Sequence, residues 1–296
     1  MHCKLCGKDK KLVRAHIIPK SLWKPLFDDE QTPQAHSAAP TFNEKKTPVG
    51  VYDTGILCAH CESIFSPWDD YAQKILLSKP IEEQYVIKNG RKIAYIETAI
   101  DYAKLKLFFI SLLWKAAVSN HYFFSRVNVG PFEPQLRRMI LKGDPGGPDT
   151  FAVVISKCEN RLGSIVLNPQ AERWGEINYY RFYVAGYMVY IKADRRPAPD
   201  YMSELALSPE KPLFVSSSRA SSIWASSSLR TPSSSRCSSL AFSRICSRYC
   251  DSSGVIRPVR YVRGIPCSRI RCTAVKKSFH WLRSTASLAI PLGVIL

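Results

Sequence analysis

The sequence lacks an apolar stretch long enough to cross a bilayer. An apolar run from Leu107 to Val118 is interrupted by Ser111 and Lys115, and the final apolar segment, LAIPLGVIL, has nine residues, whereas a spanning helix needs about 20. The first residues, MHCKLCGKDKK, contain no apolar signal core. We therefore expect no membrane partner and no secretory signal, and the run at 107–118 predicts a buried helix.

The sequence also lacks an internal repeat and a phosphate-binding glycine loop. The segment Asp144-Pro-Gly-Gly-Pro is not followed by the Lys-Ser/Thr pair and helix that complete a P-loop. This absence excludes the P-loop motif, and the segment predicts a plain loop. Residues 78–215 contain no convincing set of catalytic side chains, because Cys158 alone is insufficient.

Acidic residues are almost absent from the C-terminal part of the chain. Residues 216–296 contain one acid, Asp251, beside 13 Lys and Arg, 21 Ser and five Cys without a pattern. No helical or strand period is sustained there. This composition predicts a disordered or out-of-frame tail that begins near Val215. The alternative is a genuine Arg/Ser-rich tail that binds RNA or DNA, which the Trp, Ile, Leu and Cys content disfavours.

The positive charge of the chain is concentrated in this tail. The formal net charge is +18 for the whole chain, and residues 1–215 hold 29 basic and 23 acidic residues, a net charge of +6. If four thiols bind zinc as thiolates, about +4 remains. Any nucleic-acid surface on residues 1–215 must therefore be a local patch.

Two closely spaced cysteine pairs lie near the N-terminus. Cys3 and Cys6 form CKLC, and Cys58 and Cys61 form CAHC. Two C-x2-C pairs supply the four thiolates that a tetrahedral structural zinc needs. Because four cysteines leave no open position for water, we expect this Zn2+ to hold the fold and not to catalyse a reaction. Pairs of this kind, in place of a disulfide framework, indicate a reducing cytoplasm.

The segment between and after the pairs adds His16 in AHIIP, Asp53 in YDTGILC and Glu62 in CES. With the four cysteines, this order resembles the zinc-bound branch of the HNH endonucleases, also called the ββα-metal or His-Me finger family. The resemblance covers roughly residues 1–75, about a quarter of the chain. It implies metal-dependent hydrolysis of DNA, with RNA as an alternative substrate, in a phage, mobile-element or defence system.

Three residues depart from the family pattern. Ala15 stands where many members have Asp or His, Asp53 replaces Asn, and Glu62 replaces His. Carboxylates suit a hard cation such as Mg2+ or Mn2+ better than imidazole does. By the resemblance, Glu62 and Asp53 hold a catalytic cation, and His16 takes a proton from water, since imidazole titrates near neutral pH. Three basic residues are candidates for phosphate contacts: Arg14, Lys20 and Lys24.

Each site residue also has a simpler interpretation. His16 can be a packed histidine between apolar residues, Glu62 a solvated acid in the first turn of a helix, and Asp53 a turn residue in Tyr-Asp-Thr-Gly. The alternative function is then a catalytically degenerate zinc finger that binds nucleic acid or protein without cleavage. A third interpretation makes zinc a staple for an unrelated enzyme in residues 78–215.

These patterns together predict an α+β chain in three parts. The first is a zinc-bound ββα-metal, treble-clef-like finger at 1–77; the second is an α+β accessory domain at 78–215; the third is the tail at 216–296. In the finger, residues 11–14 and 17–18 favour a short hairpin around His16, and Ser66-Pro67 predicts the start of a helix.

The accessory domain is predicted from turn signals and periodicity. Asn89-Gly90 between two apolar runs predicts a hairpin. Helices are predicted at 98–119 and 133–142, the second closed by Gly143. Strands are predicted where β-branched and aromatic residues gather, at 151–155, 165–167 and 179–192.

Overall fold

A computed structural model describes residues 1–26, 34–36, 45–46, 50–158 and 166–218. All of them belong to one compact unit, Met1–Arg257. Apart from its first three residues, the predicted tail lies outside the described residues. The described part is a mixed α+β arrangement with the four cysteines near its N-terminus.

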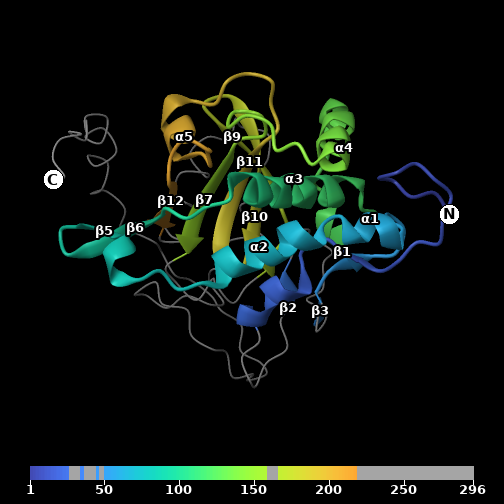
Figure 1. Cartoon of the computed structure of the whole chain (residues 1–296), viewed down its shortest axis with the longest axis horizontal. Helices are drawn as coiled ribbons and strands as arrows, with labels where there is room; N and C mark the ends of the chain where they lie inside the picture. Colours follow the sequence, from blue (N-terminus) through green and yellow to red (C-terminus); the bar gives the residue numbers. More distant parts are fainter. Residues whose placement is uncertain (27–33, 37–44, 47–49, 159–165, 219–296) are drawn as a thin grey trace, which may run out of the picture. The chain divides into compact units, whose positions relative to one another are not determined.

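Among the described residues, seven strands form one mixed sheet (Figure 1). In spatial order they are β5 (Tyr85–Lys88), β6 (Arg91–Glu97), β12 (Leu213–Ser218), β7 (Val153–Cys158), β11 (Tyr187–Lys192), β10 (Ile177–Val184) and β9 (Gln170–Trp174). Neighbouring strands are antiparallel except β12 and β7, which are parallel. Short strands form two smaller sheets: β1 (Ala15–His16) with β4 (Tyr52–Asp53), and β3 (Lys45–Lys46), β2 (Gln34–His36) and β8 (Val166–Leu167).

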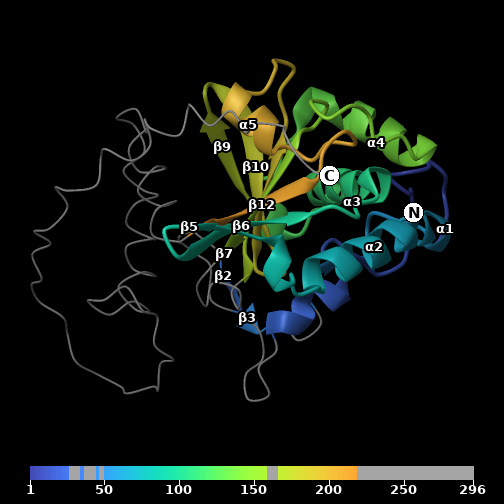
Figure 2. The ribbon, with the colours of Figure 1, turned by 60° about the vertical axis from the view of Figure 1, so that its left-hand side comes forward.

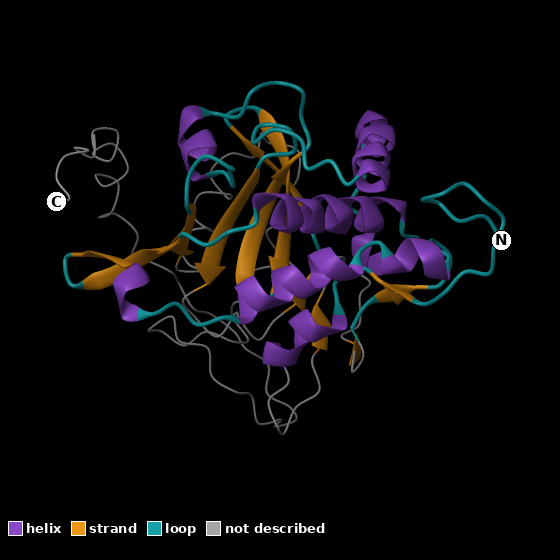
Figure 3. Cartoon of the chain, in the orientation of Figure 1, coloured by secondary structure: helices purple, strands orange, loops and turns teal. Residues whose placement is uncertain are grey.

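The α-helices are α1 (Ala59–Ser63), α2 (Ser66–Leu77), α3 (Tyr102–Val118), α4 (Glu133–Lys142) and α5 (Asp200–Leu205). The 3-10 helices are η1 (Lys20–Leu26), η2 (Glu82–Gln84), η3 (Tyr122–Phe124) and η4 (Gly130–Phe132). α2, α3 and α4 lie on one face of the large sheet, as Figure 3 shows, and α5 packs on the opposite face. α2 and α4 both pack against α3, and α5 packs against β7 and β12.

The predicted buried helix is confirmed as α3. Every residue from Leu105 to Ala116 is buried. A helix that is apolar on all sides must be covered on all sides, and here the sheet, α2 and α4 surround it. The Asp101 side chain caps its first turn by accepting a hydrogen bond from the Lys104 amide at 3.0 Å. Within the described residues, no helix is both long and apolar enough to span a bilayer.

Two predicted turns and helix starts agree with the structure. Asn89 and Gly90 join β5 to β6 with φ values of 52° and 69°, which is the geometry that an Asn-Gly hairpin favours. α2 begins at Ser66, with Pro67 in its first turn, and Phe65 occupies the N-cap position. The helix cap thus lies one residue before the predicted one.

The predicted strand at 179–192 is two strands. β10 and β11 pair around Ala185 and Gly186, which have φ values of 51° and 82°. The residues at this turn do not match a typical hairpin turn pair, because alanine rarely adopts positive φ. Alternate side chains of β10 enter different clusters: Phe182 joins the core that contains α3, whereas Tyr183 joins the cluster that contains α5.

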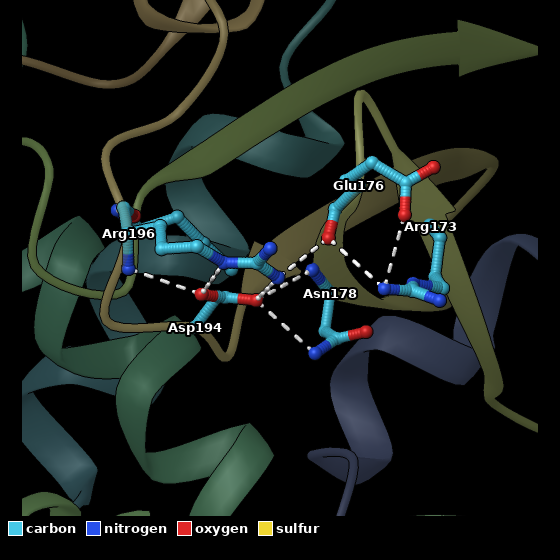
Figure 4. Close-up of polar contacts among 6 residues, drawn as sticks. Arg173, Glu176, Asn178, Asp194 and Arg196 are labelled. Carbon is cyan, nitrogen blue, oxygen red and sulfur yellow. Dashed lines mark hydrogen bonds and ion pairs between the residues drawn. The ribbon is translucent and has the colours of Figure 1, made fainter.

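A polar network fastens the turn between β9 and β10 to the segment that follows β11 (Figure 4). The Arg196 guanidinium donates to the Asp194 carboxylate at 2.7 Å and to the Glu176 carbonyl at 2.6 Å. Asn178 donates to the same carboxylate, and Arg173 pairs with the Glu176 side chain at 3.2 Å. Hydrogen bonds from Arg196 hold the pKa of Asp194 well below its usual range. Arg173, Glu176, Asn178 and Arg196 are exposed, whereas the Asp194 side chain is 7% exposed, so the network fixes the local geometry around one nearly buried acid.

Strand β12 was not predicted, and it occupies an inner position in the sheet. Leu213 and Val215 are buried, while the strand pairs with β6 on one side and β7 on the other. It continues to Ser218, so its last three residues belong to the serine run with which the predicted tail begins. Serine gives a weak strand signal, and the pairing depends on the neighbouring backbones.

Gly50 is the glycine whose replacement the structure opposes most directly. Its φ is +75°, and a Cβ atom there would lie 2.8 Å from Nε1 of Trp23. That Nε1 atom donates to the Ile18 carbonyl at 3.2 Å. A methyl group would therefore strain the backbone and displace a buried tryptophan.

We expect Gly50→Ala to lower the free energy of unfolding by about 2–4 kcal/mol, the sum of a left-handed backbone penalty and local overpacking. Gly90→Ala is the matched control, because Gly90 also has positive φ but a Cβ there meets no atom within 4 Å. It should cost only the backbone penalty, about 1–2 kcal/mol. Equal losses in chemical denaturation would contradict the Trp23 clash.

Candidate functional site

The first cysteine knuckle is a tight turn closed by backbone hydrogen bonds. The Gly7 amide donates to the Cys3 carbonyl at 2.9 Å, and the Cys3 amide donates to the Lys8 carbonyl at 3.0 Å. Gly7 has a φ of 69°, which glycine adopts without steric cost. The turn brings Cys3 and Cys6 to the same side of the chain.

The second knuckle leads directly into a helix. Cys58 is the N-cap residue of α1, and its carbonyl accepts from the Glu62 amide at 2.9 Å. The two knuckles are joined by the Lys4 amide, which donates to the Ile56 carbonyl at 2.9 Å, and by the Cys58 amide, which lies 3.4 Å from the Cys3 sulfur. These two contacts hold the knuckles against each other.

The four thiols form a group that fits a zinc ion. The sulfur atoms of Cys3, Cys6, Cys58 and Cys61 all lie within 4.8 Å of one another, and none forms a disulfide. A tetrahedral site with Zn–S bonds of about 2.3 Å needs sulfurs about 3.8 Å apart. Burial raises the pKa of Cys3, but backbone hydrogen bonds from Cys6, Cys58 and Leu5 outweigh it and lower this pKa to about 6. Burial and hydrogen bonds with the other three cysteines raise the pKa of Cys61, so a bound cation is needed for all four sulfurs to be thiolates together.

His16 lies on a two-stranded sheet beside the cysteines. The hairpin predicted within residues 11–18 is wrong: Ala15 pairs with Asp53, and His16 pairs with Tyr52. Because side chains alternate along a strand, His16 and Tyr52 share one face, and their ring centroids are 6.0 Å apart. The His16 side chain is half-buried.

Asp53 points away from His16. As the neighbour of Tyr52, it belongs to the opposite face of the two-stranded sheet. Its Oδ1 accepts from the Gly55 amide at 2.7 Å, and its Oδ2 accepts from the Ser119 hydroxyl at 2.7 Å and the Asn120 amide at 3.0 Å. Burial raises its pKa, but these hydrogen bonds prevail and lower it. Oδ2 therefore fastens the finger to the end of α3, while Oδ1 closes a local turn at Gly55.

Glu62 lies on the other side of His16, in the first turn of α1. Its carboxylate accepts a hydrogen bond from the His16 backbone. Burial raises its pKa; the Lys115 ammonium lowers it, the Asp69 carboxylate raises it, and the net direction is upward. Its Oε2 atom is buried and has no hydrogen-bond partner within the described part of the chain. Of the three predicted catalytic residues, the structure thus brings His16 and Glu62 together and turns Asp53 away.

Lys115 is the residue near the site that the sequence did not single out. It lies on α3 with a side chain that is 1% exposed, its Nζ is 3.9 Å from Oδ2 of Asp69, and it lies 4.8 Å from the centre of the Phe65 ring. The sequence shows only a lysine inside an apolar run and an acid in a predicted helix. Their proximity to Glu62 arises from the packing of α2 on α3.

Three basic residues were predicted to contact phosphate groups: Arg14, Lys20 and Lys24. Arg14 is exposed, and its Cζ lies 4.4 Å from the Tyr52 ring centre, on the same face as His16. Lys20 is exposed at the start of η1. The side chain of Lys24 lies outside the described residues. Of the three, Arg14 is therefore the one that the structure places on the face that carries His16.

Fewer described side chains could hold a second, catalytic cation than could hold zinc. Within the part of the chain that the structure describes, the four cysteines are the group of three or more His, Cys, Asp and Glu ligands that can hold a metal. Asp53 is committed to hydrogen bonds, which leaves Glu62 as the predicted acid with an unpartnered oxygen. Mg2+ commonly takes one or two carboxylates, with waters and substrate phosphate completing its shell. Glu62 supplies one such carboxylate, and its unpartnered oxygen is buried.

No family model, no curated protein and no solved structure matches this chain.

Replacing one zinc ligand should remove the metal and unfold the finger. We expect Cys61→Ser to reduce bound zinc from about one ion per chain to none, because three thiolates bind much more weakly than four. Elemental analysis by mass spectrometry after exhaustive dialysis measures this. Cys158→Ser is the control, since Cys158 is a free thiol on β7. Full zinc retention in Cys61→Ser, or loss in the control, would contradict the assignment.

Removing Lys115 should leave two buried acids without their counter-ion. We expect Lys115→Met to lower the free energy of unfolding at pH 7 by about 3–5 kcal/mol. Lys104→Met, on the same helix with a side chain that is 48% exposed, should change it by less than about 0.5–1 kcal/mol. Adding Glu62→Gln to Lys115→Met should restore part of the loss in a double-mutant cycle. A strictly additive cycle would refute the coupling.

Proposed function

We propose that this protein is an HNH-like endonuclease that hydrolyses DNA phosphodiester bonds, with His16 as general base and structural zinc as the scaffold. The observation that supports the proposal best is the link between strand β1 and helix α1. The His16 backbone binds the Glu62 carboxylate, so an imidazole and an acid stand on adjoining elements next to the four cysteines. This is the order of parts that a ββα-metal site requires.

The residues of the chain divide the reaction among them. The imidazole of His16 takes a proton from a water molecule as its oxygen attacks phosphorus, and the bond to the leaving sugar oxygen breaks. That oxygen receives a proton from solvent. Arg14, exposed on the face that carries His16, binds a neighbouring phosphate and orients the strand. Glu62 is the residue that would hold a divalent cation, which when bound neutralises charge on the phosphate.

A second candidate function is supported by the surroundings of the acids. Both carboxylate oxygens of Asp53 accept hydrogen bonds, and the Lys115 ammonium lies near the Glu62 carboxylate. A site whose acids are already neutralised and bonded suits a degenerate finger that binds nucleic acid or protein without cutting it. Binding of Mn2+ to the zinc-loaded chain separates the two, because only the nuclease needs a second metal.

The nuclease proposal predicts a specific loss on changing His16. We expect the zinc-loaded chain to nick supercoiled plasmid with Mg2+ or Mn2+, and His16→Ala to reduce the rate by roughly 100-fold or more, as loss of a general base does. His60→Ala is the matched control, because His60 is exposed in the second knuckle. Equal cleavage by both variants would rule out His16 as the base; DNA binding without cleavage by the unmodified chain would favour the degenerate finger.

A further inference from the structure

The positive charge of the folded part is concentrated in two segments. Residues 1–24 and α4 together contain ten basic and two acidic residues, whereas the other residues up to Val215 contain 19 basic and 21 acidic residues. Outside these two segments, the part before the tail is therefore slightly negative. Such segregation is the electrostatic pattern of a nucleic-acid surface.

The two basic segments lie against each other. The Arg137 Nε atom on α4 donates to the carbonyl of Leu5 in the first knuckle at 2.6 Å, and its guanidinium approaches Gly7. The Lys4 ammonium donates to the Val118 carbonyl at the end of α3 at 2.6 Å. Figures 1 and 2 show α4 beside the N-terminal loop in both views. Two segments about 130 residues apart in the sequence are thus in direct contact.

Exposed cations line both sides of this contact. On the knuckle they are Lys8, Lys10 and Lys11, and on α4 they are Arg138 and Lys142, all exposed. We call these five residues the knuckle–α4 surface. The three lysines belong to the finger that carries His16, and Arg138 and Lys142 belong to α4 of the accessory domain.

The two acids of these segments offset only two of their ten positive charges. Asp9 pairs with His2 at 3.6 Å, and the Glu133 carboxylate accepts from the Trp114 indole at 2.8 Å. A simpler role explains Lys142, because a cation in the last turn of a helix favours the helix dipole. That role explains neither Arg138, one turn earlier, nor the three knuckle lysines. The remaining explanation is a polyanionic partner.

We infer that the knuckle–α4 surface binds the phosphate backbone of duplex DNA, with α4 of the accessory domain extending the contact area of the finger. The inference rests on the proposed function for the identity of the nucleic acid. Arg138 and Lys142 contact phosphates and carry no sequence preference, because lysine and arginine on a helix surface neutralise charge and release counter-ions. The accessory domain therefore contributes to affinity, and the cysteine finger to chemistry.

Site-resolved lysine acetylation of the full zinc-loaded chain tests the inference. The His16→Ala chain is used so that a 30-base-pair duplex stays intact, and modified peptides are quantified with and without DNA. Lys8, Lys10, Lys11 and Lys142 should become severalfold slower to react. Lys74 and Lys79, exposed on and after α2, should keep their rates and serve as internal controls. Unchanged rates at Lys142 and the knuckle, or equal protection at Lys74, would overturn the inference.

Salt dependence supplies a second readout. Arg138→Gln with Lys142→Gln should lower the slope of log affinity against log salt by about 1.8, or about 0.9 for each lost phosphate contact. The charge-conserving pair Arg138→Lys with Lys142→Arg should keep the original slope, as should Lys74→Gln with Lys79→Gln. Because the basic tail is present in every variant, its own contribution cancels in the difference. An unchanged slope in the first pair refutes the contacts.

The outcomes separate this inference from the proposed cleavage. Protection of the knuckle–α4 surface without any plasmid nicking would sustain the surface and reject the nuclease. Nicking without protection would do the reverse. Displacement of the duplex by poly-glutamate as readily as by unlabelled DNA would assign the surface to an acidic protein and overturn the choice of DNA.

Discussion

The folded part depends first on the closure of one long loop by four thiols. Cys3 and Cys58 belong to segments more than 50 residues apart, and the strands between them, β1 and β4, are two residues long each. Strands this short have too few hydrogen bonds to form without help. Zinc bound to the thiols would offset the entropy of closing that loop. If zinc binds there, the position of His16 on β1 depends on the loop that the four cysteines close.

Helix α3 transmits that constraint to the sheet. The end of α3 makes two hydrogen bonds to the finger: the Ser119 hydroxyl donates to Asp53, and the Val118 carbonyl accepts from Lys4. Inside the helix, Lys115 stands between two acids of the finger side, Glu62 and Asp69. Two carboxylates and one ammonium leave the cluster one negative charge in excess, and burial raises the pKa of both acids. A buried group of this kind adds little net stability, but it penalises any arrangement in which α3 and the finger separate.

The residues that were predictable are those whose signal is local. The spacing of Cys3, Cys6, Cys58 and Cys61 predicted their grouping, and the apolar run at 107–118 predicted α3. A hairpin was predicted with arms at 11–14 and 17–18 around His16, but His16 pairs with Tyr52, 36 residues away. A two-residue strand has no period to detect, so its pairing is decided by the knuckles. The roles of Asp53 and Lys115 escaped for a related reason, since each is defined by a contact with a distant element.

Strand β12, at the other end of the described chain, is also defined by its contacts with distant segments. Its pairing with β6 runs through Leu213 to Ser216, where Leu213 and Val215 supply buried side chains. Its parallel pairing with β7 involves Ser216, Ser217 and Ser218 alone. The contact that joins the two halves of the sheet therefore consists of backbone hydrogen bonds from a serine run, together with the Ser216 hydroxyl, which donates to the Ser156 hydroxyl at 3.0 Å. Backbone pairing is largely indifferent to side-chain identity. The amino-acid composition changes after Val215, but β12 and its backbone hydrogen bonds continue for three more residues, to Ser218. Those three residues form the pairing with β7, so they belong to the sheet.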